Sequence, residues 1–141
     1  MRYMGLDLGT RTLGISLSDT THTIATLYAT IRFKEDNYDE LIPQLKEIIS
    51  ENDVSKIILG LPKNMNNTIG PRALVTMEFM EKLKKELQIE VILQDERLTT
   101  VEATNYMLEA DMSRKKRKQK IDSLAANIIL QTYLDKEKKE G

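Results

Sequence analysis

Acidic residues at three separated positions have sequence contexts that suit metal chemistry. Asp7 lies within the apolar run of residues 4–8, where a carboxylate without a compensating partner would cost free energy. Asp95 and Glu96 follow a second apolar run, and Asp122 stands at the start of a final helical pattern. A salt bridge, a helix cap or a favourable helix-dipole contact would explain each acid separately. A bound cation would explain all of them together.

Carboxylates in such a set can hold two divalent ions about 4 Å apart, one activating water and the other stabilising the leaving oxygen of a phosphodiester. The chain has no cysteine, which excludes disulfides, thiolate metal sites and a cysteine nucleophile. Its one histidine, His22, lies in a threonine-rich stretch far from the acids, where a surface role is expected. Hard oxygen ligands favour Mg²⁺ or Mn²⁺, so a two-metal carboxylate site for one of these ions is predicted.

The surroundings of Asp7 favour a site over a purely structural carboxylate. Alternation along a strand places Asp7 on the same face as Tyr3 and Gly5. Gly5, Gly9 and Gly14 lack side chains, so we expect room for a ligand to approach.

The second acidic cluster follows a predicted strand, and ligands of open α/β sheets bind near the carboxyl ends of strands. Asp95 and Glu96 point to opposite sides of that strand, so one of them enters such a site. The other would cap the next helix or pair with Arg97. The residues alone do not select between the two acids.

A basic segment precedes Asp122. It carries six cations and no acid in a chain whose net charge is −1: Arg114, Lys115, Lys116, Arg117, Lys118 and Lys120. Nucleic-acid-binding proteins often concentrate positive charge in one patch. A solvated charge run beside a helix is an equally weighted alternative.

Apolar periodicity predicts the elements that position these residues. Strands are expected over 2–8, 13–18, 23–33, 56–61 and 90–96. Helices are expected from Asn37, as N-cap, to residue 49, over 71–87, from Thr99 to about residue 111, and over 121–136. The inward residues of the 71–87 and 121–136 helices are expected to be Leu74, Met77, Met80, Leu83 and Leu87, and Ile121, Leu124, Ala125, Ile128 and Thr132.

This order predicts an α/β fold: a mixed five-stranded sheet, with an antiparallel three-strand meander plus parallel strands, flanked by helices. The order matches the ribonuclease H-like arrangement, and 141 residues fit a single domain over 1–141. No apolar stretch is long enough to cross a bilayer, and the start of the chain lacks the layout of a signal peptide. We therefore expect a cytoplasmic protein with no membrane partner.

The sequence resembles the YqgF family, described both as Holliday junction resolvases and as pre-16S rRNA nucleases. The resemblance spans nearly the whole chain and rests on five runs in family order: Gly5-Leu6-Asp7-Leu8-Gly9-Thr10-Arg11, Gly60-Leu61-Pro62, Gly70-Pro71-Arg72-Ala73, Asp95-Glu96-Arg97-Leu98-Thr99-Thr100 and Asp122-Ser123-Leu124-Ala125-Ala126. It implies a ribonuclease H-like fold and metal-dependent phosphodiester hydrolysis. It also implies that Asp7, Glu96 and Asp122 are the catalytic, metal-binding acids.

The same resemblance makes nucleic acid the expected partner. Residues expected to contact it are Thr10, Arg11, Arg72, Arg97, Arg114, Lys115, Lys116, Arg117, Lys118 and Lys120. It favours 5′-end processing of pre-16S rRNA in ribosome biogenesis over resolution of Holliday junctions. Resolution would need two coordinated sites, hence a symmetric dimer, whereas we expect a monomer or a weak homodimer.

Two other classes of protein fit parts of the pattern. The turn Asp7-Leu8-Gly9-Thr10-Arg11 resembles the first phosphate-binding hairpin of actin-like ATPases, but 141 residues are too few for their second lobe. A non-catalytic RNA-binding ribosome-assembly factor could retain the same acids. Metal-dependent cleavage would distinguish the nuclease from that factor.

Overall fold

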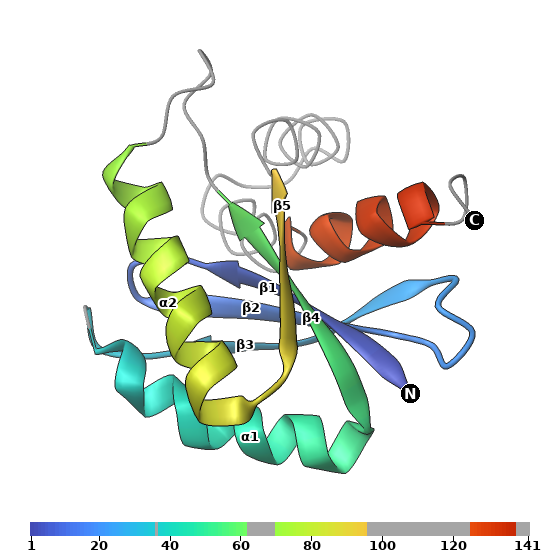
Figure 1. Cartoon of the computed structure of the whole chain (residues 1–141), viewed down its shortest axis with the longest axis horizontal. Coiled ribbons are helices and arrows are strands. Elements are labelled where there is room, and N and C mark those ends of the chain that lie inside the picture. The colour runs from blue at the N-terminus through green and yellow to red at the C-terminus, as the bar shows by residue number, and fades with distance from the viewer. Residues whose placement is uncertain (36, 62–69, 96–124, 138–141) are drawn as a thin grey trace, which may run out of the picture.

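A computed structural model of the chain describes residues 1–35, 37–61, 70–95 and 125–137. Its centre is a five-stranded sheet of order β3-β2-β1-β4-β5 (Figure 1). β1 (Arg2–Leu8), β2 (Thr12–Ser18) and β3 (Ala25–Arg32) form an antiparallel meander, whereas β4 (Val54–Leu61) is parallel to both β1 and β5 (Glu90–Asp95). The predicted mixed sheet is confirmed. The helix predicted from Thr99 and the basic segment lie outside the described residues.

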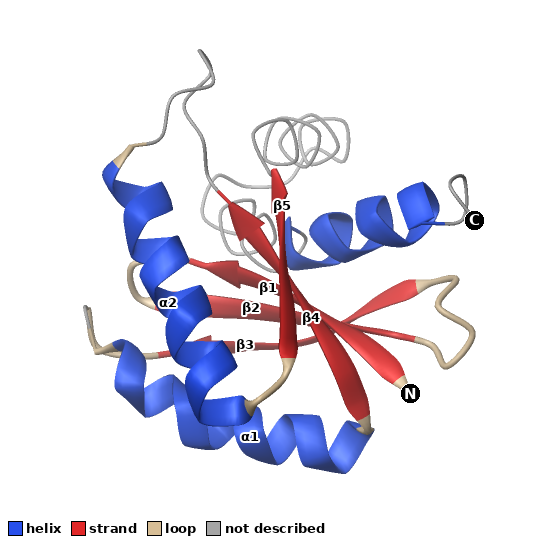
Figure 2. Ribbon diagram, in the orientation of Figure 1, coloured by secondary structure: helices blue, strands red, loops and turns tan. Residues whose placement is uncertain are grey.

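Helices lie on both faces of this sheet (Figure 2). The 3₁₀ turn η1 (Tyr38–Glu40), α1 (Leu41–Asn52) and α2 (Pro71–Leu87) lie on the first face, and the helix of residues 125–137 lies on the second. Within the described residues, no helix has the length and apolar character needed to span a membrane.

Strand alternation divides the apolar side chains between the two faces. Met4, Leu6 and Leu8 of β1 pack in the larger core beneath α1 and α2, and Met4 and Leu6 are fully buried. Burying one such side chain contributes roughly 1.5–3 kcal/mol. Tyr3 and Ile58 face the other way and pack with the helix of residues 125–137. Asp7 shares this second face, as predicted.

The inward face of α2 agrees with the prediction in part, since Leu83 is fully buried and Met80 and Leu87 pack against the core, but it differs in the first turn. Leu74 is 56 % exposed, while the fully or nearly fully buried positions are Ala73, Thr76, Phe79 and Leu83. Thr76 is buried at little cost because its hydroxyl donates to the carbonyl of Arg72. The helix therefore turns small residues toward the sheet at its first turn. Pro71 opens α2 as expected.

The last helix buries Ala125 as predicted, but its other buried residues differ from the expected ones. Its buried residues are Ala125, Ala126, Ile129, Leu130 and Leu134. Ile128 is only half-buried and Thr132 is exposed, whereas Ile121 and Leu124 lie outside the described residues. The reason lies in the sheet beneath, where Gly5 admits the backbone of Ala126.

The first helix begins later than predicted. Asn37 precedes η1 but makes no side-chain cap bond; its amide donates to the carboxylate of Glu40 at 3.1 Å. That carboxylate also accepts from the backbone N–H of Lys34 at 3.0 Å. The two residues therefore close a local turn, and the α-helix itself starts at Leu41.

Candidate functional site

Asp7 lies near the carboxyl end of β1, where its neighbours on both adjacent strands are glycines. It pairs with Gly14 of β2. On the other side Leu6 pairs with Leu59 of β4, and the next positions along these strands are Asp7 and Gly60. The half-buried carboxylate is therefore flanked by strand positions that carry no side chain. Gly60 did not figure in the sequence prediction of this site.

The parallel pairing brings further chain to the same edge. Because β1, β4 and β5 run in one direction, their carboxyl ends lie at one edge of the sheet. Gly60 pairs with Gln94 and Leu61 with Asp95, the last residue of β5. The arrowheads of β4 and β5 point toward the same edge of the sheet in Figure 1. Glu96 is the next residue in the sequence and lies outside the described residues. The described part of the chain thus brings the end of β5 to the edge at which Asp7 stands.

The helix of residues 125–137 runs antiparallel to β1 across the second face. Near its start, the carbonyl of Ala126 accepts a hydrogen bond of 2.8 Å from the Ser16 hydroxyl. Near its end, a Glu137 carboxylate oxygen lies 3.4 Å from the hydroxyl of Tyr3. The end of the helix that carries Ala125, its first described residue, is therefore directed toward the carboxyl edge of β1. Asp122 precedes Ala125 by three residues and lies outside the described residues.

Two of the three glycines around Asp7, Gly5 and Gly9, have structural uses that were not predicted. A Cβ at Gly5 would lie 2.7 Å from Leu130 Cβ, 2.9 Å from the Ala126 carbonyl oxygen, and closer still to the Ser16 hydroxyl. Gly5 therefore makes room for the helix, and the expectation of ligand space there is wrong. Gly9 forms a tight turn in which its N–H donates to the Thr12 carbonyl at 2.8 Å.

Three of the predicted nucleic-acid contacts lie in the described part. Thr10 and Arg11 are exposed in the turn between β1 and β2, and Arg11 forms a 3.2 Å ion pair with Glu35. Arg72 is half-buried and donates to the Leu8 carbonyl at 3.1 Å and to the Tyr38 hydroxyl at 3.4 Å. Arg97 and the six cations of the basic segment lie outside the described residues.

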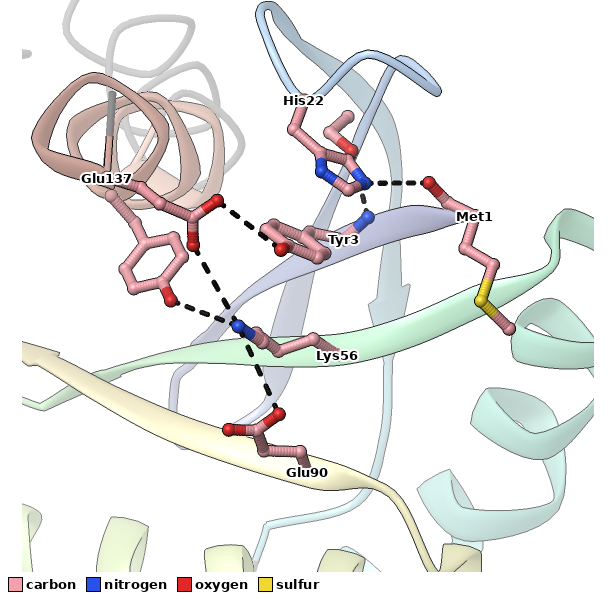
Figure 3. A network of polar contacts seen from close by, with 8 residues as sticks. Met1, Tyr3, His22, Lys56, Glu90 and Glu137 are labelled. Atoms are coloured by element: carbon pink, nitrogen blue, oxygen red, sulfur yellow. Dashed lines mark hydrogen bonds and ion pairs between the residues drawn. The ribbon is translucent and has the colours of Figure 1, made fainter. Parts of the chain in front are cut away.

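A second polar cluster lies around Lys56, which pairs with Tyr3 near the amino end of β1, away from Asp7. Figure 3 shows this cluster. The Lys56 ammonium is 3.2 Å from the Tyr133 hydroxyl and 4.7 Å from the centre of the Tyr3 ring. Glu137 and Glu90 lie 3.9 and 4.0 Å from it. Burial alone would lower the pKa of Lys56, but the hydrogen bond and the charges of these neighbours outweigh it, so the pKa is raised. Burial has the opposite effect on the Tyr133 hydroxyl, whose pKa it raises.

His22 belongs to the margin of that cluster. Its ring stacks on Tyr3 with centroids 3.9 Å apart, and its Nε2–H donates to the Met1 carbonyl at 2.8 Å (Figure 3). The histidine is therefore half-buried and structural, far from the carboxyl edge. As expected, His22 has no chemical role in the site. It differs from the expectation in that its ring packs on Tyr3.

Within the described residues, no three acidic or histidine side chains gather closely enough to hold a metal ion. Of the three predicted ligands, only Asp7 belongs to that part of the chain. The donor type does fit a divalent cation, because a half-buried carboxylate supplies hard oxygen ligands. The two flanking glycine positions add no side chain that would cover it.

Known proteins match this chain over almost its full length. A family model described as "RuvX: Holliday junction resolvase" matches residues 1–136. A Thermoanaerobacter pseudethanolicus protein named "Putative pre-16S rRNA nuclease" is 51% identical over 139 residues, which cover 98% of this chain and 99% of the relative. A Clostridium botulinum protein of the same name is 50% identical, with coverage of 96% and 97%.

Solved structures agree on the fold. The fowlpox virus Holliday junction resolvase aligns with a TM-score of 0.57 at 14% identity, over 96% of this chain and 99% of its own. Thermus thermophilus RuvC in complex with a Holliday junction substrate aligns with a TM-score of 0.53 at 13% identity, over 92% and 91%. The predicted ribonuclease H-like architecture is thereby confirmed. With its family model and relatives matching nearly end to end, the chain belongs to the RuvX, or YqgF, family of Holliday junction resolvases.

Proposed function

We propose that this protein is a metal-dependent nuclease that hydrolyses phosphodiester bonds of structured nucleic acid, with precursor 16S rRNA as its substrate. The relatives that are about half identical over nearly the whole chain carry the name of a pre-16S rRNA nuclease. The observation that carries the proposal is the half-buried Asp7 carboxylate between Gly14 and Gly60, at the edge where β5 also ends. Processing of this RNA during ribosome assembly takes place in the cytoplasm, where we expect the protein to act.

The proposed site consists of Asp7, Glu96 and Asp122. Two Mg²⁺ or Mn²⁺ ions, when bound, would supply Lewis-acid activation of water and charge stabilisation at the leaving oxygen. Asp7 would supply its carboxylate from a strand held on both sides by backbone pairing, which keeps its position fixed relative to β4 and β5. Glu96 directly follows Asp95 of β5, and Asp122 lies three residues before Ala125. These sequence separations support one shared site at the carboxyl edge.

Contacts between basic side chains and the phosphate backbone would orient the nucleic acid. Arg11 lies in the turn between β1, which carries Asp7, and β2. Within the described residues it is a basic side chain that a phosphate can reach, since its present partner is the exposed Glu35. Exposed ion pairs of this kind contribute little, so a phosphate can replace the carboxylate at small cost. The basic segment would add sequence-independent attraction that weakens as salt rises.

A second candidate function is cleavage of four-way DNA junctions, which the name of the matching family favours. A four-way junction must be cut at two related positions, and two active sites would be needed in a symmetric dimer. Precursor RNA can be trimmed by a monomer. The substrates and the oligomeric state required therefore separate the two functions.

The direct test is cleavage of a precursor 16S transcript beside a synthetic four-way DNA junction, with one preparation and with either Mg²⁺ or Mn²⁺. We expect cleavage of the transcript that stops when the metal is chelated. Asp7→Asn should reduce the rate by at least about 10³-fold, because ligand loss removes several kcal/mol of transition-state stabilisation. Glu96→Gln and Asp122→Asn should do the same.

Asp19→Asn is the matched control, because Asp19 is an acid at the far end of β2 that only stabilises its own turn. It should cleave like the wild type. Full activity of Asp7→Asn would overturn the assigned role, and cleavage of the junction alone would favour the second function. Binding of the transcript without cleavage by the wild type would identify an assembly factor.

A further inference from the structure

We propose that Arg32 binds the phosphodiester backbone of the nucleic acid beside Asp7, and so holds the substrate strand across the end of the β1–β2–β3 meander. This inference rests on the proposed function, in which Asp7 stands at the reacting phosphate. Arg32 is the last residue of β3, and its side chain is exposed. None of the sequence motifs includes it.

Strand register places Arg32 on the same face of the sheet as Asp7. Asp7 pairs with Gly14 of β2, and Gly14 pairs with Thr30 of β3. Arg32 is two residues beyond Thr30 on the same strand, and a step of two residues returns to the same face. Ile31, which lies between them, packs instead against the core on the opposite face. The guanidinium of Arg32 and the carboxylate of Asp7 therefore project from one side of the sheet.

The separation of the two residues suits contacts to neighbouring phosphates of one strand. Paired strands lie about 4.8 Å apart and advance about 3.4 Å per residue, so two strands and two residues separate the Cα atoms of Asp7 and Arg32 by about 12 Å. An extended arginine side chain spans much of that distance. A strand with one phosphate at Asp7 can therefore present a nearby phosphate to Arg32.

The guanidinium of Arg32 is available for such a contact. Among the described residues, no hydrogen bond or ion pair engages it. The other three arginines of this part of the chain each contact the protein: Arg2, Arg11 and Arg72. An arginine presents five N–H donors in a planar fork that matches the oxygens of a phosphate. An exposed fork without a protein partner, on the face of the candidate acid, is therefore a phosphate contact in waiting.

Local contacts hold the end of β3 where this contact requires it. The backbone N–H of Phe33 donates to the carbonyl of Arg11 at 2.9 Å, which fixes the residue after Arg32 against the β1–β2 turn. Thr12, which pairs with Arg32, adds a hydroxyl on the same face. Glu35 forms its ion pair with Arg11 and leaves Arg32 uncompensated.

A second role for this charge predicts a different result. β3 is an edge of the sheet, and a charged side chain on an edge strand can serve only to prevent pairing with another chain. Loss of the charge would then promote self-association and leave the affinity for RNA unchanged. Size-exclusion chromatography of the same variants measures this effect.

The test measures binding of a labelled fragment of the precursor 16S transcript to the full chain by fluorescence anisotropy. EDTA prevents metal-dependent cleavage, and salt concentrations of about 50 and 200 mM report the number of phosphate contacts. Lys46→Gln is the matched control for Arg32→Gln, because Lys46 is an exposed cation of α1 on the other face of the sheet. Neither side chain has a partner among the described residues, so both variants should unfold at the wild-type midpoint.

We expect Arg32→Gln to raise the dissociation constant roughly 5- to 10-fold at the lower salt concentration, and Lys46→Gln by less than about 2-fold. The slope of log affinity against log salt should fall by about 0.7 in Arg32→Gln, the value for one phosphate contact with a single strand. Arg32→Lys keeps the charge and should keep the slope, although it loses the planar fork.

In the cleavage assay with Mg²⁺, Arg32→Gln should raise KM and leave kcat within about 2-fold, because the contact exists before and during the reaction. Equal dissociation constants and slopes for Arg32→Gln and Lys46→Gln would overturn the inference, and self-association of Arg32→Gln with unchanged affinity would assign the residue to edge protection. Failure of the proposed function would look different: the wild type would bind the transcript without cleaving it, and the weaker binding of Arg32→Gln would persist.

Discussion

The Arg72 guanidinium donates a hydrogen bond of 3.1 Å to the carbonyl of Leu8, the residue that follows Asp7. A second donor of the same side chain reaches the Tyr38 hydroxyl at 3.4 Å. The first turn of α2 is thereby tied to the end of β1. This arginine was expected to contact phosphate, yet the structure gives it partners within the protein.

Arg72→Gln should therefore lower stability, whereas Arg11→Gln should lower nucleic-acid affinity. The first change removes part-buried hydrogen bonds from a charged donor, for a loss of about 1–3 kcal/mol of unfolding free energy. The second removes an exposed ion pair that contributes at most about 1 kcal/mol. Urea unfolding measures the first effect, and fluorescence anisotropy with labelled RNA at two salt concentrations measures the second. The reverse pattern would make Arg72 the phosphate ligand.

Gly5→Ala should destabilise the protein despite its small size. The new methyl group would lie 2.7 Å from Leu130 Cβ and 2.9 Å from the Ala126 carbonyl oxygen, so the helix must move away from the sheet. Overpacking of this kind costs about 1–3 kcal/mol. Chemical denaturation of the variant beside the wild type gives the value. An unchanged midpoint would show that the helix does not approach the sheet as closely as the structure has it.

Lys56→Met should loosen the other end of the same helix while preserving the apolar stem of the side chain. We expect a loss of about 1 kcal/mol, since one charged hydrogen bond is removed from a partly exposed position. The pKa of Lys56 is raised, so its contribution is complete below its ordinary value of 10.5 and disappears as pH rises through the higher folded-state value. Unfolding in urea at pH 7, 9 and 11.5 should show the wild-type advantage shrinking only at the highest pH. A constant difference across all three would contradict this assignment.

Asp19 should account for part of the acid sensitivity of the fold. Its carboxylate accepts hydrogen bonds from the Thr21 hydroxyl and from the N–H groups of Thr23 and Ile24, which lower its pKa from 3.8 to about 2. The stabilisation is therefore present above pH 3.8 and is lost as pH falls through about 2. Asp19→Asn keeps an acceptor oxygen but cannot titrate, so its melting temperature should fall less between pH 4 and pH 2. An equal fall in melting temperature for the two proteins between pH 4 and pH 2 would show that Asp19 does not contribute to acid sensitivity.

Strand positions were predictable because alternation within a few residues determines which side chains are buried. β1 matches its predicted bounds, and Asp7 lies on the predicted face. The helix faces were less predictable, because Leu74 and Ala73 are both apolar and only the neighbouring sheet decides which one points inward. Local sequence gives the period of a helix, whereas its rotation depends on what it packs against.

The residues of the candidate site also fall into those that local sequence predicted and those that it did not. The acid in an apolar strand was a strong local signal, and so was the run of residues around it. Ser16 gave no such signal, since a serine in an alternating strand is ordinary, and Gly60 belongs to one of the family runs but nothing local placed it beside Asp7. Their importance follows from strand register and from a helix more than 100 residues away in the sequence, which no local window contains.

The helix over Asp7's face also has a consequence for biosynthesis. The strand that carries Asp7 is translated before the segment that packs on its face, residues 125–137, and more than 100 residues separate the two. Contacts between such distant segments form late, because the entropy cost of closing a long loop must be met before the contacts can stabilise the fold. The sheet of β1 to β5 can therefore form before the helix of residues 125–137 packs on it, and under the proposed function we expect cleavage activity only after that helix has been translated.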